Sequence, residues 1–192
     1  MMKVLSYLLL LAFFNQNSFA QTSSVRRPSS GFSFIGNDYI TAQRIRSTSL
    51  AAVLRDKKVA SFKEMGHGLA VHYIKGFNPH IDFNASIAGS FVEIQLPGKT
   101  SSQDDFLLEI DGSANFKMFE DAVTTVNPYI IAGIGASKYT NVFGAFMPLG
   151  VGIDVNIFNE ARFFTSLQYR VPVTPEANLH HFQVSFGISS FF

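Results

Sequence analysis

The C-terminal fifteen residues, 178–192, alternate in polarity along their whole length and end on an aromatic residue. One set is almost entirely apolar: Phe182, Val184, Phe186, Ile188, Ser190 and Phe192. The other set is small or polar: His181, Gln183, Ser185, Gly187 and Ser189. Because successive side chains of a β-strand point to opposite faces, the pattern predicts a strand that separates an apolar environment from a polar one.

The same alternation recurs in six earlier segments, which are 66–73, 81–91, 106–118, 128–139, 144–158 and 161–171. In 144–158, for example, Leu149 and Val151 alternate with Gly150 and Gly152. These lengths are near or above the ~9–11 residues with which a tilted strand crosses a bilayer. Together with the C-terminal segment, the sequence therefore predicts seven membrane-crossing strands.

An eighth strand is expected at 31–40, which contains Phe32 and Phe34 but alternates poorly. Bacterial single-chain barrels have an even number of strands, and closure leaves no unpaired strand edge in lipid. Residues 47–56 resemble a capped helical turn in the first long loop, with the alternative that they form the true first strand. We therefore predict an all-β fold, an eight-stranded antiparallel up-and-down transmembrane β-barrel.

Alternation alone does not decide which face points outward, because a soluble lipocalin-like barrel alternates with its apolar face inward. The polar face here holds mainly Gly, Ser, Asn and Gln, whereas a soluble surface would carry Lys and Glu. The apolar face is almost free of charge, and a Lys or Arg at the bilayer midplane would cost about 2–4 kcal/mol. Tyrosines near the predicted strand ends fit the headgroup level. They are Tyr39, Tyr73, Tyr129, Tyr139 and Tyr169.

The N-terminus has the pattern of a secretory signal peptide over residues 1–20, with Lys3 before a short apolar run and a small-x-small site ending at Ala20. The alternative, a membrane anchor, is disfavoured because a spanning helix needs about 20 apolar residues. We expect a periplasmic lead-in at 21–30 and the barrel at 31–192, in the outer membrane of a Gram-negative cell. The turns at 76–80, 120–127 and 159–160 would then face the periplasm, and the loops at 44–63, 96–104, 140–143 and 173–177 the outside.

Composition excludes several classes of function. The chain has no Cys, which excludes a lipoprotein anchor, a disulfide framework and a thiolate metal site. A formal net charge of +1 gives no reason to expect nucleic acid as a partner. His180 and His181 are adjacent, so their side chains point to opposite faces of a strand, and we expect no metal site and no cofactor.

Several charged residues fall on the polar face of the predicted strands, and they are Asp82, Glu109, Asp111, Lys117, Asp154, Arg162 and Arg170. Buried charges must be paired, and eight strands leave an interior only wide enough for side chains. We therefore predict a structural salt-bridge network that plugs the lumen. The alternative is a narrow ion or proton path through it.

Some eight-stranded barrels act on lipid A, which makes an enzyme the other alternative. Such catalysis needs a Ser nucleophile beside a His and an orienting acid. The candidates are His180, His181 and Ser185, but the His-x-Ser pattern of the deacylases is absent, since Phe182 and Gln183 follow His181. His67 and His72 lie on another strand and are interpreted as ordinary rim or lumen histidines. We expect no enzymatic activity.

The C-terminal strand resembles the signal that the bacterial barrel-assembly machinery recognises, in the form Ser185-x-Gly187-x-x-Ser190-x-Phe192. Ser190 departs from the apolar residue usual at its position. The resemblance implies that this machinery is a partner during insertion, with Ser185, Gly187 and Phe192 as the matching residues.

A longer resemblance spans nearly the whole predicted mature chain. It rests on 37–39, 41–46, 68–71, 75–76, 89–92, 128–129, 133–139 and 168–173. These segments are similar to the barrel domain of Bacteroidetes-type outer-membrane proteins, often the N-terminal half of outer-membrane protein A-like chains. The larger relatives continue into a peptidoglycan-binding domain, and this sequence stops at Phe192, so their wall-tethering role is not expected here.

The segment 44–63 is long and basic, with Arg44, Arg46, Arg55, Lys57, Lys58 and Lys63. It could contact lipopolysaccharide phosphates or an unknown surface partner, and the alternative is a solvated loop. The sequence thus favours a small outer-membrane barrel with a structural or surface-interaction role, surrounded by outer-membrane lipid and lipopolysaccharide.

Overall fold

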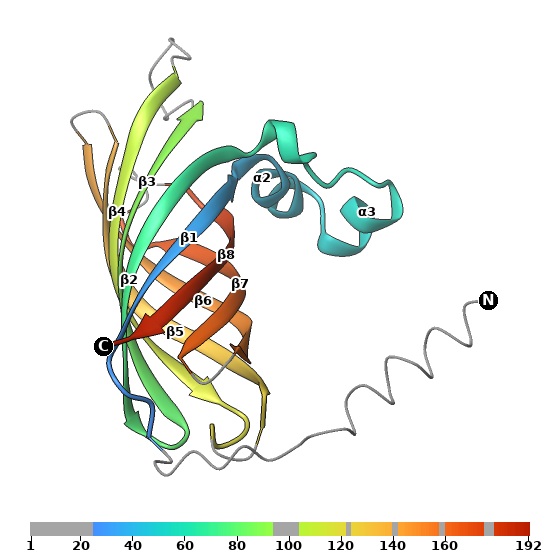
Figure 1. The fold of residues 1–192 in the computed structure, drawn as a ribbon. Coiled ribbons are helices and arrows are strands. Elements are labelled where there is room, and N and C mark those ends of the chain that lie inside the picture. The colour runs from blue at the N-terminus through green and yellow to red at the C-terminus, as the bar shows by residue number, and fades with distance from the viewer. Residues whose placement is uncertain (1–24, 94–103, 122–123, 140–141, 158–159, 175–178) are drawn as a thin grey trace.

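The computed structural model describes residues 25–93, 104–121, 124–139, 142–157, 160–174 and 179–192, so the predicted signal peptide lies outside the described residues. Within them the chain forms a closed barrel of eight antiparallel strands with a helical excursion after the first strand (Figure 1). The strands are β1 (Ser29–Asp38), β2 (Gly66–Asn78), β3 (Ile81–Glu93), β4 (Asp104–Lys117), β5 (Val126–Tyr139), β6 (Val142–Ile157), β7 (Ala161–Pro172) and β8 (His181–Phe191).

Each strand pairs with the next in the sequence, and β1 pairs with β8 to close the barrel. The closing register joins Phe32 to Ile188 and Asp38 to Phe182. Closure satisfies backbone groups that an open sheet would leave unpaired in lipid. Ser29 and Phe191 lie at one end of the barrel, which we call the terminal end, and the opposite end is the loop end. The predicted up-and-down topology is confirmed.

The outward face of the barrel is apolar. Leu149 and Val151 of β6 are 45% and 56% exposed, while Gly152 and Asp154 on the alternate positions point inward or are buried. The same alternation holds in β7, where Phe163 and Leu167 are exposed and Arg162 is buried. A soluble barrel would reverse these faces, so the predicted orientation, with apolar side chains outside, is confirmed.

The environment of the first strand explains why its polarity alternates poorly. Its terminal half alternates, but all four residues from Ile35 to Asp38 are buried. Ile35 and Asn37 face the lumen, whereas the outward positions Gly36 and Asp38 are contacted by Met65 and Thr41 of the segment that follows. The strand begins at Ser29 and ends at Asp38, so Tyr39 belongs to the helix that follows. An eighth strand in this region is therefore confirmed, with its bounds two residues earlier than predicted.

The long loop after β1 contains α2 (Tyr39–Ser47), α3 (Leu50–Arg55) and the short 3₁₀ helix η1 (Phe62–Glu64). Asp38 begins α2 by accepting a hydrogen bond from the Thr41 N–H, and Ser49 begins α3 in the same way with Ala52. The predicted helical turn is confirmed, and the alternative that 47–56 forms the first strand is wrong. Among the described residues, no helix is long and apolar enough to cross a membrane.

The tyrosine prediction is partly wrong. Tyr129 and Tyr139 are each 7% exposed and lie inside the barrel, because their positions share the inward face of β5 with Ile131. Tyr39 also points inward, and its ring stacks on that of His181 at 4.4 Å. Tyr73 faces outward as expected, with 40% of its surface exposed.

Candidate functional site

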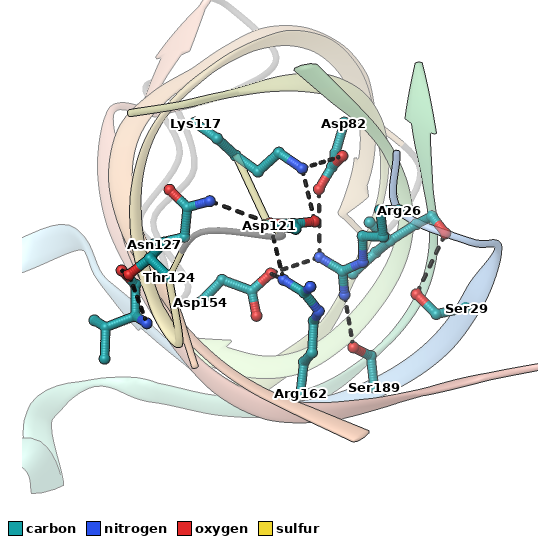
Figure 2. A network of polar contacts seen from close by, with 12 residues as sticks. Arg26, Ser29, Asp82, Lys117, Asp121, Thr124, Asn127, Asp154, Arg162 and Ser189 are labelled. Carbon is teal, nitrogen blue, oxygen red and sulfur yellow. Dashed lines mark hydrogen bonds and ion pairs between the residues drawn. The ribbon is translucent and has the colours of Figure 1, made fainter. Parts of the chain in front are cut away.

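The terminal end of the lumen holds a compact group of ion pairs, which we call the terminal-end cluster. It consists of Arg26, Asp82, Lys117, Asp121, Asp154 and Arg162. Figure 2 shows these side chains pointing toward one another inside the ring of strands. They come from four strands, from the lead-in before β1 and from the turn after β4, so the cluster joins segments far apart in the sequence.

The lead-in residue Arg26 reaches farthest in sequence. Its guanidinium lies 2.6 Å from the Asp154 carboxylate and 3.4 Å from that of Asp82. Its other terminal nitrogen donates a hydrogen bond to Ser189 Oγ on β8 at 2.8 Å. Arg26 therefore ties the segment before β1 to β3, β6 and β8.

The remaining pairs complete the cluster. Lys117 Nζ lies 2.9 Å from both Asp82 and Asp121. Arg162 lies 3.1 Å from Asp121 and 3.3 Å from Asp154. The side chains of all six residues are no more than 3% exposed, and three bases face three acids. Since buried charges are tolerated only when paired, the balance of signs is what allows this cluster to exist inside the barrel.

A second polar group, the loop-end cluster, surrounds Arg170. The Arg170 guanidinium contacts Glu109 at 2.8 Å and Asp111 at 3.1 Å, and it donates to Gln183 Oε1 at 2.6 Å. His181 Nε2 lies 3.4 Å from the other Glu109 oxygen. Gln183 in turn donates to Asn37 on β1 at 3.0 Å. The cluster thus connects β4 and β7 with both strands of the closing seam.

Beyond the loop-end cluster, apolar side chains pack together at the loop end of the barrel. Val92, Leu107 and Tyr139 are buried together at the loop ends of β3, β4 and β5. Partly buried hydrophobic residues pack against them, and they are Tyr39, Val142 and Leu179. We call this group the apolar lid, since it lies at the end of the barrel that carries the long loop.

Between the two clusters lies a cavity of about 20 Å³, room for about one water. His72, Asn84 and Ser166 are among its lining residues. His72 Nε2 lies 2.8 Å from Ser33 Oγ, a Ser–His pair that alternation along the chain did not reveal because its members are on different strands. Both residues are buried, so the pair has space for water but not for a substrate.

The structure locates all seven predicted lumen charges inside the barrel, divided between the two clusters: Asp82, Lys117, Asp154 and Arg162 in one, Glu109, Asp111 and Arg170 in the other. Sequence reasoning missed Arg26 and Asp121, which lie outside the strands. The i,i+4 spacing of Asp121 from Lys117 was an available signal, and Arg26 had none beyond its proximity to β1.

The histidines and the predicted assembly signal lie apart. His180 Nδ1 is 3.0 Å from the Tyr169 hydroxyl, whereas His181 points into the lumen. Ser185 Oγ lies 2.7 Å from Ser166 Oγ, so His180, His181 and Ser185 form no common site. Phe192 is 75% exposed at the terminal end. Among the described residues, no group of three or more His, Asp or Glu side chains could hold a metal ion.

Comparison with solved structures agrees with this geometry. Neisserial surface protein A matches with a TM-score of 0.53 and 14% identity, covering 88% of this chain and 98% of that one. The N-terminal β-barrel domain of Pseudomonas aeruginosa OprF matches with a TM-score of 0.50 and 11% identity, covering 86% and 98%. No family model and no curated protein matches the sequence. The chain therefore has the fold of the small eight-stranded outer-membrane β-barrels.

Proposed function

We propose that this protein is a small outer-membrane barrel whose lumen is plugged, and that it serves a structural or surface-interaction role without catalysis. The observation that carries this proposal is the neutral, fully buried terminal-end cluster beneath an apolar lid. The terminal end faces the periplasm and the loop end faces the outside. Residues 1–20 are removed as a signal peptide, and outer-membrane lipid and lipopolysaccharide surround the mature chain.

The arrangement of the lumen argues against a wide pore. Ion pairs at 2.6–3.4 Å cross the interior at the terminal end, and a second set crosses it near the loop end. An eight-stranded barrel has an interior that side chains fill. A narrow ion or proton path is the second candidate, favoured by the polar cavity that lies between the clusters.

The histidine geometry argues against lipid A chemistry. A hydrolase needs its nucleophile and base together at a site that the substrate can reach. The Ser33–His72 pair is enclosed, and His180 contacts a tyrosine on the outer side. The outward position of Phe192 and the small residue Gly187 support insertion by the barrel-assembly machinery. Segments such as 68–71, 133–139 and 168–173 support membership of the Bacteroidetes-type barrels.

Deletion in the native host tests this proposal. The protein is expected in the outer-membrane fraction, with folded and heat-unfolded forms that migrate differently in gels. Lipid A mass spectra of the deletion strain should match those of the parent, and the purified barrel should give no conductance steps in planar bilayers. An altered lipid A would establish the enzyme instead, and reproducible steps would establish the ion path.

A further inference from the structure

The helical segment 39–65 lies beside the barrel and does not cover its mouth. In Figure 1, α3 stands clear of the wall on the side of β1, and the tips of β3 and β4 extend beyond it at the loop end. Only the start of the segment, at Tyr39, enters the lumen. Helix α3 therefore lies beside the barrel wall, in a position that lipid would occupy around a barrel in a membrane.

The segment is a folded unit that internal hydrogen bonds and buried side chains hold together. Arg44 donates to the Lys58 carbonyl oxygen at 2.8 Å, and the Ala60 N–H donates to Thr41 Oγ1 at 2.8 Å. Val53 is 2% exposed and Ala60 6%. These contacts fold the chain between α2 and η1 back onto α2, so the remaining side chains are presented on a fixed surface.

That surface exposes several large apolar side chains. Leu50, Leu54, Val59 and Phe62 are each between 48% and 64% exposed. The Phe62 ring meets the ring of His67 at 4.3 Å, and His67 is exposed on the outward face of β2, two residues before Leu69. The exposed apolar residues of the segment are thus continuous with the outward face of the barrel.

The same segment concentrates positive charge. It contains six basic and two acidic side chains, a formal charge of +4, although the whole chain carries only +1. The basic residues on the exposed part are Arg46, Arg55, Lys57, Lys58 and Lys63. Exposed apolar residues beside clustered bases are the combination by which helical segments lie in the interface of an anionic membrane.

We propose that segment 39–65 is an interfacial anchor on the outer leaflet. Its apolar side chains enter the acyl region beside β1 and β2, and its exposed bases bind the phosphates of the surrounding anionic lipid. This inference rests on the proposed outer-membrane location. It adds a specific lipid-binding surface to one side of the barrel, so that the barrel has a preferred lipid neighbour there.

The absence of Trp from the chain makes a direct test available. Leu54→Trp gives a single fluorophore on α3, and Leu149→Trp gives one on the outward face of β6 as a control. Each protein is reconstituted into vesicles of phosphatidylcholine with brominated acyl chains, alone, with phosphatidylglycerol or with lipid A. Both tryptophans are expected to emit at short wavelength and to be quenched by bromine, and quenching at position 54 should increase with anionic lipid.

A charge variant tests the phosphate contact. Arg46, Arg55, Lys57 and Lys58 are changed to Gln in the Leu54→Trp protein, while Arg44 is kept because it holds the fold of the segment. Quenching should fall to its level in phosphatidylcholine alone. Changing the exposed strand residues Lys75 and Lys138 to Gln is the matched control and should leave quenching unchanged.

Three results would overturn the anchor. Iodide-accessible, long-wavelength emission from position 54 with normal quenching at 149 would put the segment in water while leaving the barrel proposal intact. Emission that shifts only as the protein-to-lipid ratio rises would mean that a second copy covers it. Equal quenching with and without anionic lipid would remove the phosphate contact. Failure of quenching at position 149 would instead contradict the membrane location itself.

Discussion

At the scale of single residues, Arg170 is the lumen side chain on which most depends. It is paired with two carboxylates, Glu109 and Asp111, at 2.8 and 3.1 Å, and all three side chains are at most 2% exposed. Arg170→Met would leave both carboxylates buried without their main partner. We expect a loss of about 3–5 kcal/mol in the free energy of unfolding, the usual consequence of breaking a buried pair from one side.

Urea unfolding in vesicles or micelles measures this loss. Lys75→Met is the matched control, because Lys75 is exposed on β2 and removal of an exposed charge changes stability by less than about 1 kcal/mol. Equal midpoints for Arg170→Met and Lys75→Met would show that the loop-end cluster contributes nothing to stability.

Gly187 illustrates how a residue predicted to be an assembly signal also has a packing role. A Cβ there would meet the Phe32 carbonyl oxygen and the Ser33 side chain on β1, with the Phe164 ring close by. Gly187→Ala is therefore expected to reduce the fraction of heat-resistant folded protein on refolding without any machinery present. Gly36→Ala is the control, because a Cβ there meets only the flexible Met65 side chain. If Gly187→Ala refolds like the parent protein, this glycine serves recognition alone.

The two residues that sequence reasoning missed show what alternation can supply. Alternation correctly assigned each charged residue of a strand to the lumen face, because odd and even positions point to opposite faces within any one strand. Arg26 and Asp121 enter the lumen from a lead-in and a turn, where no period applies. Which charges form ion pairs also depends on the stagger between neighbouring strands. The stagger decides whether Asp154 is at the height of Arg26 or at the height of Arg170 along the barrel axis. That stagger is a property of the closed sheet and is not encoded in any one strand.

At the scale of elements, β1 was difficult to predict because two environments act on it. Its terminal half alternates between exposed and buried positions, whereas in Ile35 to Asp38 the inward positions contact the lumen and the outward positions contact the segment that follows. The helices of the long loop were predictable only in part. A capped helical turn was predicted at 47–56, where α3 lies. Helix α2 was not predicted, because its first residues were assigned to the first strand and it has no clear apolar face from which its position against β8 could be inferred.

The turn η1 gives an element-scale prediction about pH. The Ser61 backbone N–H and hydroxyl both donate to the Glu64 carboxylate, at 2.7 and 2.8 Å, and these hydrogen bonds lower the pKa of Glu64. Because they favour the ionised form, their stabilisation of the turn is present above the ordinary glutamate pKa. It is lost as the pH falls through the lowered pKa.

Ser61→Ala removes the hydroxyl donor, so the pKa of Glu64 is expected to rise toward its ordinary value. A titration of the Glu64 carboxyl by NMR in micelles measures the change. Ser30→Ala, on the outward face of β1, is the control and should leave that titration as it is in the parent. An unshifted titration in Ser61→Ala would mean that the capping contact does not persist in solution.

At the scale of the whole molecule, the plug that we propose has three layers in series that share no residue, and they are the terminal-end cluster, the loop-end cluster and the apolar lid. The terminal-end cluster holds ion pairs at one end, and the apolar lid of Val92, Leu107 and Tyr139 packs at the other. The two ends are stabilised by different interactions, which are ion pairs at the terminal end and packing of apolar side chains at the loop end. A change in one layer should therefore leave the others in place, and conduction would require that all three be opened.

Planar bilayer recordings test this arrangement. Arg26→Ala removes contacts to Asp154, Asp82 and Ser189, and we expect it to remain non-conducting because the apolar lid is intact. Tyr139→Ala should be non-conducting for the converse reason. The two changes together should still give no steps, because the contacts of Arg170 with Glu109 and Asp111 also cross the lumen. Arg27→Ala is the matched control, as Arg27 is exposed and its guanidinium lies over the Phe191 ring. Heat-modifiable migration establishes that each variant is folded, and steps from Arg26→Ala alone would mean that the loop end is open.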